Sequence, residues 1–221
     1  MQADRAKTVA ALVTMAAALL ALYFSLREAP PQFDGRPQEA LGQVLGEEAA
    51  KLVGSGGRIA LISRDTSAVI NPATQWQVKG LVEALRKANL TISITNRIKQ
   101  DPLRLVRVPP GEFLQLIKKH SEGDVIVSLM GPPLLTSEQR AGLPEKGPRI
   151  VAVCVGAMPA QVNLRELFRQ DLVQVAVTSR TQSGPEPVPS SNLRAWFDQL
   201  YQIVTATNVA ELPLVTNSLA P

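Results

Sequence analysis

The fold is decided by residues 58–88, which read RIALISRDTSAVINPATQWQVKGLVEALRKA. This segment opens with a short apolar run, passes through a polar turn and ends in a long amphipathic stretch. Pro72 stands where the first turn of a helix accepts proline. Trp76, Leu81 and Leu85 then recur at the spacing of one helical face. The segment predicts a buried strand followed by a helix, which is the first βα unit of a parallel sheet.

Four further apolar runs, separated by helical patterns, predict four more strands. They occupy residues 90–95, 124–129, 149–155 and 171–177. The first of these alternates apolar with polar residues, and Gln174 interrupts the last, so we expect both at the edges of the sheet. The fold class predicted is α/β, a three-layer Rossmann-like parallel sheet of about five strands in the order 2-1-3-4-5. A final helix is predicted from Asn192 to Thr205.

An apolar segment near the N-terminus predicts a membrane anchor. Residues 8–26 carry no charge, and as a helix they would extend ~28 Å, close to the hydrocarbon thickness of a bilayer. Arg5 and Lys7 precede the segment, which favours a cytoplasmic N-terminus and an extracytoplasmic, periplasmic domain. The alternative is a cleaved signal peptide, which would release the domain as a secreted protein.

The domain organisation follows from these segments. We expect residues 1–27 to form the cytoplasmic tip and transmembrane signal-anchor, and residues 28–57 a proline-rich spacer with a leading helix. Residues 58–205 form a single α/β domain, and residues 206–221 a C-terminal tail. The glycine cluster at residues 54–57 precedes a strand and lacks a Lys-Ser/Thr pair, so it reads as a turn rather than a phosphate loop.

Composition excludes several classes of partner. The formal net charge is +4 with 4% aromatic residues, and the cations are scattered, so no nucleic-acid surface is predicted. Cys154 is the only cysteine and lies within an apolar run, which excludes an intrachain disulfide and predicts a buried thiol.

The predicted strand order also predicts where a ligand would bind. Ligands of such sheets lie beyond the carboxyl ends of the strands, where the winding reverses, here between the first and third strands. The polar loop after the first strand and the glycine-containing turns after the third and fourth meet at this edge. Their candidate ligand-binding residues are Asp65, Thr66, Ser67, Asn71, Met130, Gly131 and Gly156.

No recognisable catalytic set accompanies this edge, so the sequence predicts no enzyme, cofactor or metal site. The loop after the first strand has no glycine signature for a flavin or dinucleotide. His120 is the only histidine, and we expect it to face solvent at a helix end. Apart from Glu112 or Glu138, no second carboxylate is expected near Asp65.

Residues 58–178 resemble one lobe of the type I periplasmic binding protein family, the sugar-binding and LacI-like proteins. The resemblance rests on Asn71-Pro72, Trp76 and Lys79-Gly80, together with the strand segments at residues 122–128 and 149–153. It implies ligand contacts from Asp65, Thr66, Asn71 and Trp76. The family closes two lobes on a ligand, whereas the resemblance here covers one.

Two functions are therefore open. The first is a membrane-anchored, non-catalytic binding module that contacts another protein of the envelope. The alternative is a small-molecule, sugar-type binding or sensing subunit associated with a transporter, in which dimerisation would restore a cleft.

Overall fold

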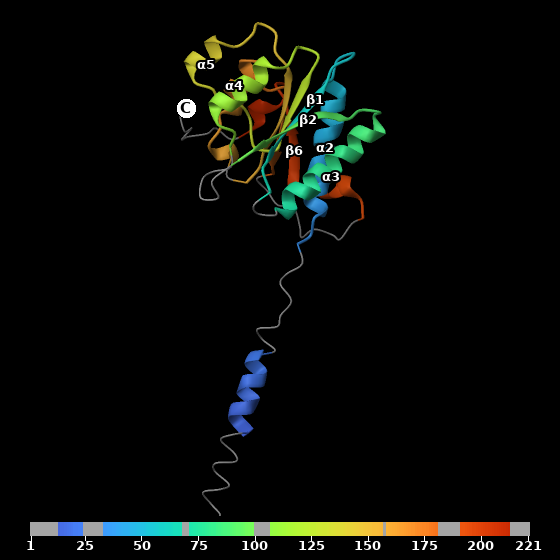
Figure 1. Cartoon of the computed structure of the whole chain (residues 1–221), viewed down its shortest axis with the longest axis vertical. Helices are drawn as coiled ribbons and strands as arrows, with labels where there is room; N and C mark the ends of the chain where they lie inside the picture. The colour runs from blue at the N-terminus through green and yellow to red at the C-terminus, as the bar shows by residue number, and fades with distance from the viewer. Residues whose placement is uncertain are drawn as a thin grey trace, which may run out of the picture. The chain divides into compact units, whose positions relative to one another are not determined.

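The computed structural model describes residues 13–23, 33–67, 71–99, 107–156, 158–180 and 191–212 (Figure 1). The chain divides into two compact units, residues 1–34 and 35–221. The elements of the larger unit are α2 (Arg36–Leu52), β1 (Ile59–Arg64), α3 (Pro72–Lys87), β2 (Ile92–Ile98), α4 (Pro110–Lys118), β3 (Val125–Ser128), α5 (Ser137–Ala141), β4 (Arg149–Cys154), η1 (Met158–Ala160), α6 (Leu164–Arg169), β5 (Val175–Ser179), α7 (Leu193–Leu200), β6 (Tyr201–Val204) and η2 (Val209–Glu211).

The smaller unit contains a helix over residues 13–23 whose apolar side chains are exposed to solvent. The rest of the predicted anchor, at residues 8–12 and 24–26, lies outside the described residues, as does most of the proline-rich spacer. Among the residues described, none of the helices has both the length and the apolar character needed to cross a bilayer.

The sheet confirms the predicted strand order and adds a strand. Within the described residues the order is β2-β1-β3-β4-β5-β6, with the first five strands parallel. The prediction of β5 as an edge strand was wrong, because β6 pairs antiparallel with it and Tyr201 lies opposite Ser179. The last helix ends at Leu200 instead of continuing to Thr205, since the chain turns back there to cover the open side of β5.

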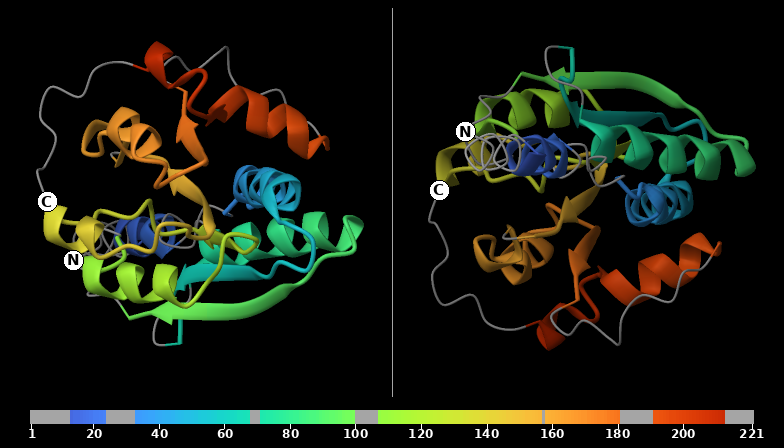
Figure 2. Two further views of the ribbon diagram at one scale, coloured as in Figure 1. Left: turned by 90° about the horizontal axis from the view of Figure 1, so that it is seen from above. Right: turned by 90° about the horizontal axis from the view of Figure 1, so that it is seen from below.

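Helices cover both faces of the sheet. Helices α2, α3 and α7 pack on one face, and α4 and α6 on the other, as the two views along the sheet show (Figure 2). The continuous apolar runs of β1, β3 and β4 supply fully buried side chains to both cores, which is typical of central parallel strands. Cys154, at the end of β4, is completely buried, and burial raises the pKa of its thiol to about 12.

Helix α2 belongs to the same compact unit as the sheet, and it contacts α3 along a line of glycines. A Cβ atom on Gly42 would lie 1.9 Å from the backbone oxygen of Gln77, and one on Gly80 would lie 2.1 Å from the backbone oxygen of Glu39. Only glycine permits this approach of two helix backbones. Leu41 and Leu45 of α2 are consequently pressed into the core beside the first strand.

The turn at residues 54–57 connects α2 to β1 and packs on the turn before β3. The Gly54 amide donates to the Gly123 carbonyl over 3.0 Å, and a Cβ on Gly57 would meet that same oxygen at 1.9 Å. The glycines are thus used for a close backbone approach, as a turn between two elements requires.

Candidate functional site

The loop after β1 places three of the predicted residues together at the carboxyl edge of the sheet. The Asp65 amide donates to the Ile98 carbonyl, which ties the loop to the end of β2, and the Asp65 carboxylate accepts from the Ser67 amide over 3.0 Å. Asp65 and Thr66 are half-buried and Ser67 is exposed. Hydrogen bonding from Ser67 lowers the pKa of Asp65, with Lys99 and Arg97 adding favourable charge. Asp65 is therefore an accessible anion.

Arg97 and Lys99 were missed by the sequence reasoning, which ended the predicted strand at residue 95. The structure extends β2 through Ile98, so both cations stand beside the loop after β1. A weak signal was present in the sequence, since Ile98 lies at the two-residue spacing set by Ile92 and Ile94, although Asn96 interrupts the apolar alternation.

Asn71 caps α3. Its side-chain oxygen accepts from the Thr74 amide over 3.3 Å, and Pro72 occupies the first helical position, as the sequence predicted. The residue is half-buried, so part of its side chain stays accessible at the carboxyl edge.

Asn71→Ala is expected to destabilise the domain by about 1 kcal/mol, because the Thr74 amide loses its acceptor. Asn71→Ser keeps a capping oxygen and should stay within a few tenths of a kcal/mol of the wild type. Urea unfolding of both variants checks this. Equal stability of Asn71→Ala and wild type would show that the cap contributes nothing and that Asn71 serves another role.

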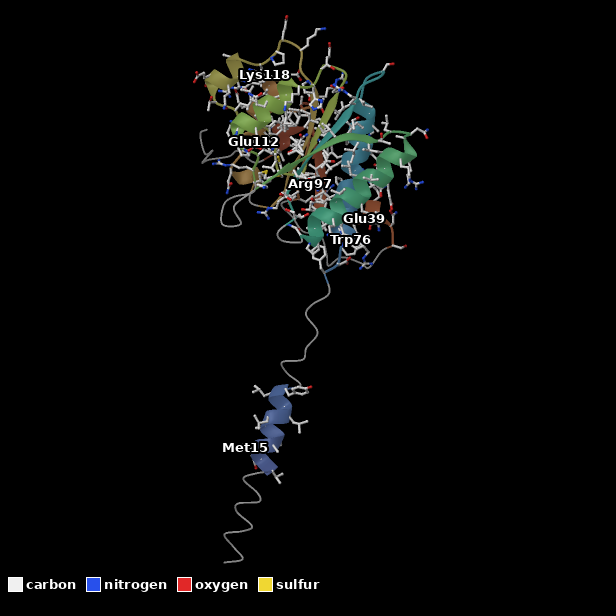
Figure 3. The ribbon with its side chains drawn as sticks, viewed as in Figure 1. Met15, Glu39, Trp76, Arg97, Glu112 and Lys118 are labelled. Atoms are coloured by element: carbon white, nitrogen blue, oxygen red, sulfur yellow. The ribbon has the colours of Figure 1, made fainter. Side chains whose placement is uncertain are left out.

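Trp76, on the first turns of α3, is engaged by the protein itself. Lys79 places its ammonium 4.5 Å from the ring centroid and pairs with Glu39 over 2.8 Å. Gly35, at the start of α2, lies so close that a Cβ there would stand 2.1 Å from the indole. Figure 3 shows Trp76 beside Glu39 where α3 and α2 begin. The ring thus joins two helices.

Met130 and Gly131, after β3, form a buried turn. Ser128 donates its hydroxyl hydrogen to the Gly131 carbonyl over 2.6 Å, and Met130 is 1% exposed. Gly131 has a φ of +95°, and the sulfur of Met158 would lie 2.8 Å from a Cβ at this position. The turn after β3 is therefore filled by the side chain of Met158.

Gly156, after β4, is exposed with a φ of +67°. Its amide donates to the Ser179 hydroxyl over 3.2 Å, which links the carboxyl ends of β4 and β5. Of the predicted residues, Asp65, Thr66, Ser67, Asn71 and Gly156 offer surface at this edge. Met130 and Gly131 lie beneath it, and Trp76 lies against Gly35.

The opposite edge of the sheet holds a buried carboxylate. Asp124 is 2% exposed and accepts from the Arg58 amide over 2.8 Å, from the Arg58 guanidinium over 3.1 Å and from the Ser121 amide over 2.9 Å. Burial alone raises the pKa of Asp124, but the hydrogen bonds from Arg58 and Ser121 outweigh it and hold that pKa well below its usual value.

The prediction that His120 faces solvent was wrong. Its side chain is 7% exposed and its Nδ1 lies 3.4 Å from the Asp124 carboxylate. The reason is that the turn between α4 and β3 brings the ring and the Ser121 amide to the same buried carboxylate, Asp124. The histidine is thus at the amino edge, whereas Asp65 is at the carboxyl edge. Within the described ranges, no three His, Cys, Asp or Glu residues are grouped to hold a metal ion.

A cavity of about 390 Å³ also lies at the amino edge, between the end of α4 and the loops before β4 and β5. Two pairs of its polar lining residues contact each other: Lys146 pairs with Glu122 over 3.2 Å, and Gln174 donates to the Asp171 carbonyl over 2.9 Å. Because the cavity lies at the amino edge, it is distinct from the predicted ligand edge.

The fold resembles that of periplasmic sugar-binding proteins, which confirms the predicted resemblance. A periplasmic ribose ABC transporter protein from Conexibacter woesei aligns with a TM-score of 0.51 at 11% identity, over 79% of this chain and 59% of that one. An arabinose-binding protein from Geobacillus stearothermophilus aligns with a TM-score of 0.51 at 15% identity, over 80% of this chain and 63% of that one. The chain spans about three fifths of the length of these structures. No family model and no curated protein matches the sequence.

Proposed function

We propose that this chain is a membrane-anchored, non-catalytic extracytoplasmic binding module whose carboxyl edge contacts another protein of the envelope. The observation that carries this proposal is the contrast along that edge. Polar surface is presented at this edge by Asp65, Thr66 and Ser67. Met130, by contrast, is buried. The ring of Trp76 packs against Gly35 and Lys79. Small-molecule sites are concave and largely apolar. A polar surface at which Trp76 already packs against its own chain is better suited to contact with a protein surface.

The anchor in this proposal rests on the sequence. Residues 8–26 are long enough as a helix for the hydrocarbon core, and Arg5 and Lys7 favour a cytoplasmic N-terminus. A short tether would then hold the domain near the outer surface of the membrane. A non-catalytic role is supported by the separation of His120 and Asp124 from Asp65 at opposite edges of the sheet.

Site-specific photocrosslinking tests the protein contact. A photoreactive residue at Ser67 in the full chain is expected to give one discrete adduct in native membranes, and the same residue at Ser137, away from the proposed surface, is the control. Asp65→Lys should abolish the Ser67 adduct because it reverses the charge of the surface. Equal adducts at both positions, or an adduct that Asp65→Lys leaves unchanged, contradicts the proposal.

The second candidate is binding of a sugar-type ligand at the same edge, which the fold shared with ribose- and arabinose-binding proteins favours. A thermal-shift screen of the full chain in detergent with ribose and arabinose distinguishes the two. We expect no shift at millimolar sugar. A saturable rise in Tm that is lost in Asp65→Ala would replace the first proposal by this one.

A further inference from the structure

Four cations lie at the carboxyl edge of the sheet where β1 and β2 end and α4 begins. Arg64, the last residue of β1, lies opposite Ile98 in the register of the two strands. It is therefore flanked by Arg97 and Lys99, the two chain neighbours of Ile98. Arg107 precedes α4 at the same edge, and it is exposed, as are Arg97 and Lys99. These four residues are called the basic cluster below.

The charge of the basic cluster is not neutralised by the protein itself. Among the described residues, none of its four cations forms an ion pair. In the described part of this edge, Asp65 and Glu112 are the only nearby carboxylates, so positive charge is in excess. At the amino edge, by contrast, Lys51, Arg58 and Lys146 each pair with a carboxylate. The basic cluster is thus an accessible surface of net positive charge.

The chain enters the domain at this same edge. Helix α2 ends in the turn that leads into β1 at the amino edge, so its first residue lies at the carboxyl edge. Gly35 accordingly lies against Trp76, near the start of α3. Residues 27–35 connect the predicted membrane span to α2, and they reach at most about 30 Å when fully extended. If residues 8–26 cross a bilayer, the start of α2 lies within that distance of the lipid headgroups.

We propose that the basic cluster docks the domain onto anionic phospholipid headgroups of the membrane that holds its anchor. Guanidinium and ammonium groups bind phosphate oxygens, and several cations near an anionic bilayer act together. A layer of headgroups matches an open surface, whereas a free phosphate ion is usually held in a concavity lined by backbone amides. Most side chains of the basic cluster are exposed, which fits the layer.

Protection of an open strand edge is a simpler role for Arg97 and Lys99, since charged residues on an edge strand discourage pairing with other strands. That role does not account for Arg64, because β1 lies between β2 and β3, or for Arg107, which lies outside the sheet. The inference rests on the anchor of the proposed function but not on its protein contact. Vesicles of pure lipid therefore test it separately.

Fluorescence quenching in vesicles tests the docking. The full chain, with a dye on Ser67→Cys, is reconstituted into phosphatidylcholine vesicles that contain a headgroup-nitroxide lipid, with or without phosphatidylglycerol. Cys154 is completely buried, so it takes no label in the folded protein. We expect phosphatidylglycerol to increase quenching at residue 67 several-fold and to leave a dye on Ser137→Cys unaffected. Ser137 begins α5, whose C-cap Gly142 lies near Lys118 at the amino edge.

Two charge-reversal variants identify the surface. Arg97→Glu combined with Lys99→Glu should abolish the effect of phosphatidylglycerol, because each cation near an anionic bilayer favours docking about five-fold. Lys118→Glu combined with Lys119→Glu makes the same change of charge at the amino edge, where both lysines are exposed, and should retain the effect. Figure 3 shows Lys118 well away from Arg97. Persistence of the effect in the first variant, or its loss in the second, overturns the proposal.

Extraction with carbonate separates this inference from the proposed function. Where the chain resists extraction, equal quenching at residues 67 and 137, or no response to phosphatidylglycerol, refutes the docking alone. This is the result expected if the basic cluster binds an acidic protein segment instead, and it leaves the anchor standing. Release of the chain from phosphatidylcholine vesicles by carbonate refutes the anchor, and with it both this inference and the membrane attachment in the proposed function.

Discussion

Asp124→Ala is expected to destabilise the domain by about 3 kcal/mol at pH 7. The substitution removes the charged acceptor of the Arg58 and Ser121 amides, and a hydrogen bond to a charged group contributes about 1.5–3 kcal/mol. The Arg58 guanidinium is itself largely exposed, so its charge adds little beyond these hydrogen bonds. Urea unfolding followed by circular dichroism measures the loss.

Glu122→Ala is the matched control, because Glu122 lies in the same turn but, within the described residues, pairs only with exposed Lys146. Its effect is expected to stay within about 0.5 kcal/mol. If the two variants were equally stable, the Asp124 hydrogen bonds would contribute nothing and the account of this turn would be wrong.

Asp124 also predicts how stability depends on pH. The pKa of Asp124 is lower in the folded than in the unfolded chain, where it is about 3.9. The carboxylate therefore stabilises the fold fully above about pH 4, and this contribution is lost as the pH falls toward the folded pKa. The difference in unfolding free energy between wild type and Asp124→Asn should shrink as the pH falls below 4. A constant difference down to pH 2 would contradict the lowered pKa.

Gly42→Ala should destabilise the domain by about 3 kcal/mol, although alanine is the better helix former by about 1 kcal/mol. The added methyl would stand 1.9 Å from the Gln77 backbone oxygen, so α2 and α3 must move apart. Leu41 and Leu45 would then lose contacts in the core beneath. Guanidinium unfolding of the variant gives the value.

Gly111→Ala provides the comparison, because Gly111 also lies in a helix but a Cβ there meets nothing within 4 Å. This variant should equal or exceed the wild type in stability, by up to about 1 kcal/mol. A neutral Gly42→Ala would mean that α2 can shift along α3 without cost, and the close packing of these helices would be refuted.

The strand order could be predicted because the pattern of apolar residues in each run indicates whether one or both faces of that strand are covered. Continuous runs such as Val125–Ser128 are covered on both faces, whereas the alternating run around Ile94 is not. Strand β6 could not be predicted, because Tyr201 and Val204 continue the helical spacing of α7 and only the open side of β5 makes them a strand. Tertiary pairing here overrides the local period.

The candidate site was predictable only in part. Asp65 and Asn71 come directly after a strand and before a helix, so their place at the carboxyl edge follows from topology. The burial of Met130 depends on Met158, and the engagement of Trp76 depends on Gly35. These contacts join residues far apart in the sequence, and no local pattern encodes them.

Reaction of the Cys154 thiol can be used to measure how often the domain unfolds. Its thiol is completely enclosed at the end of β4, and its raised pKa of about 12 keeps it protonated, so a reagent can reach a reactive thiolate only when the sheet opens. Where reclosing is faster than labelling, the rate of modification measures the free energy of opening directly. The same labelling rate could be measured with the protein in a membrane, without denaturant. A slower rate in the presence of a bound partner would show that the partner stabilises the folded domain.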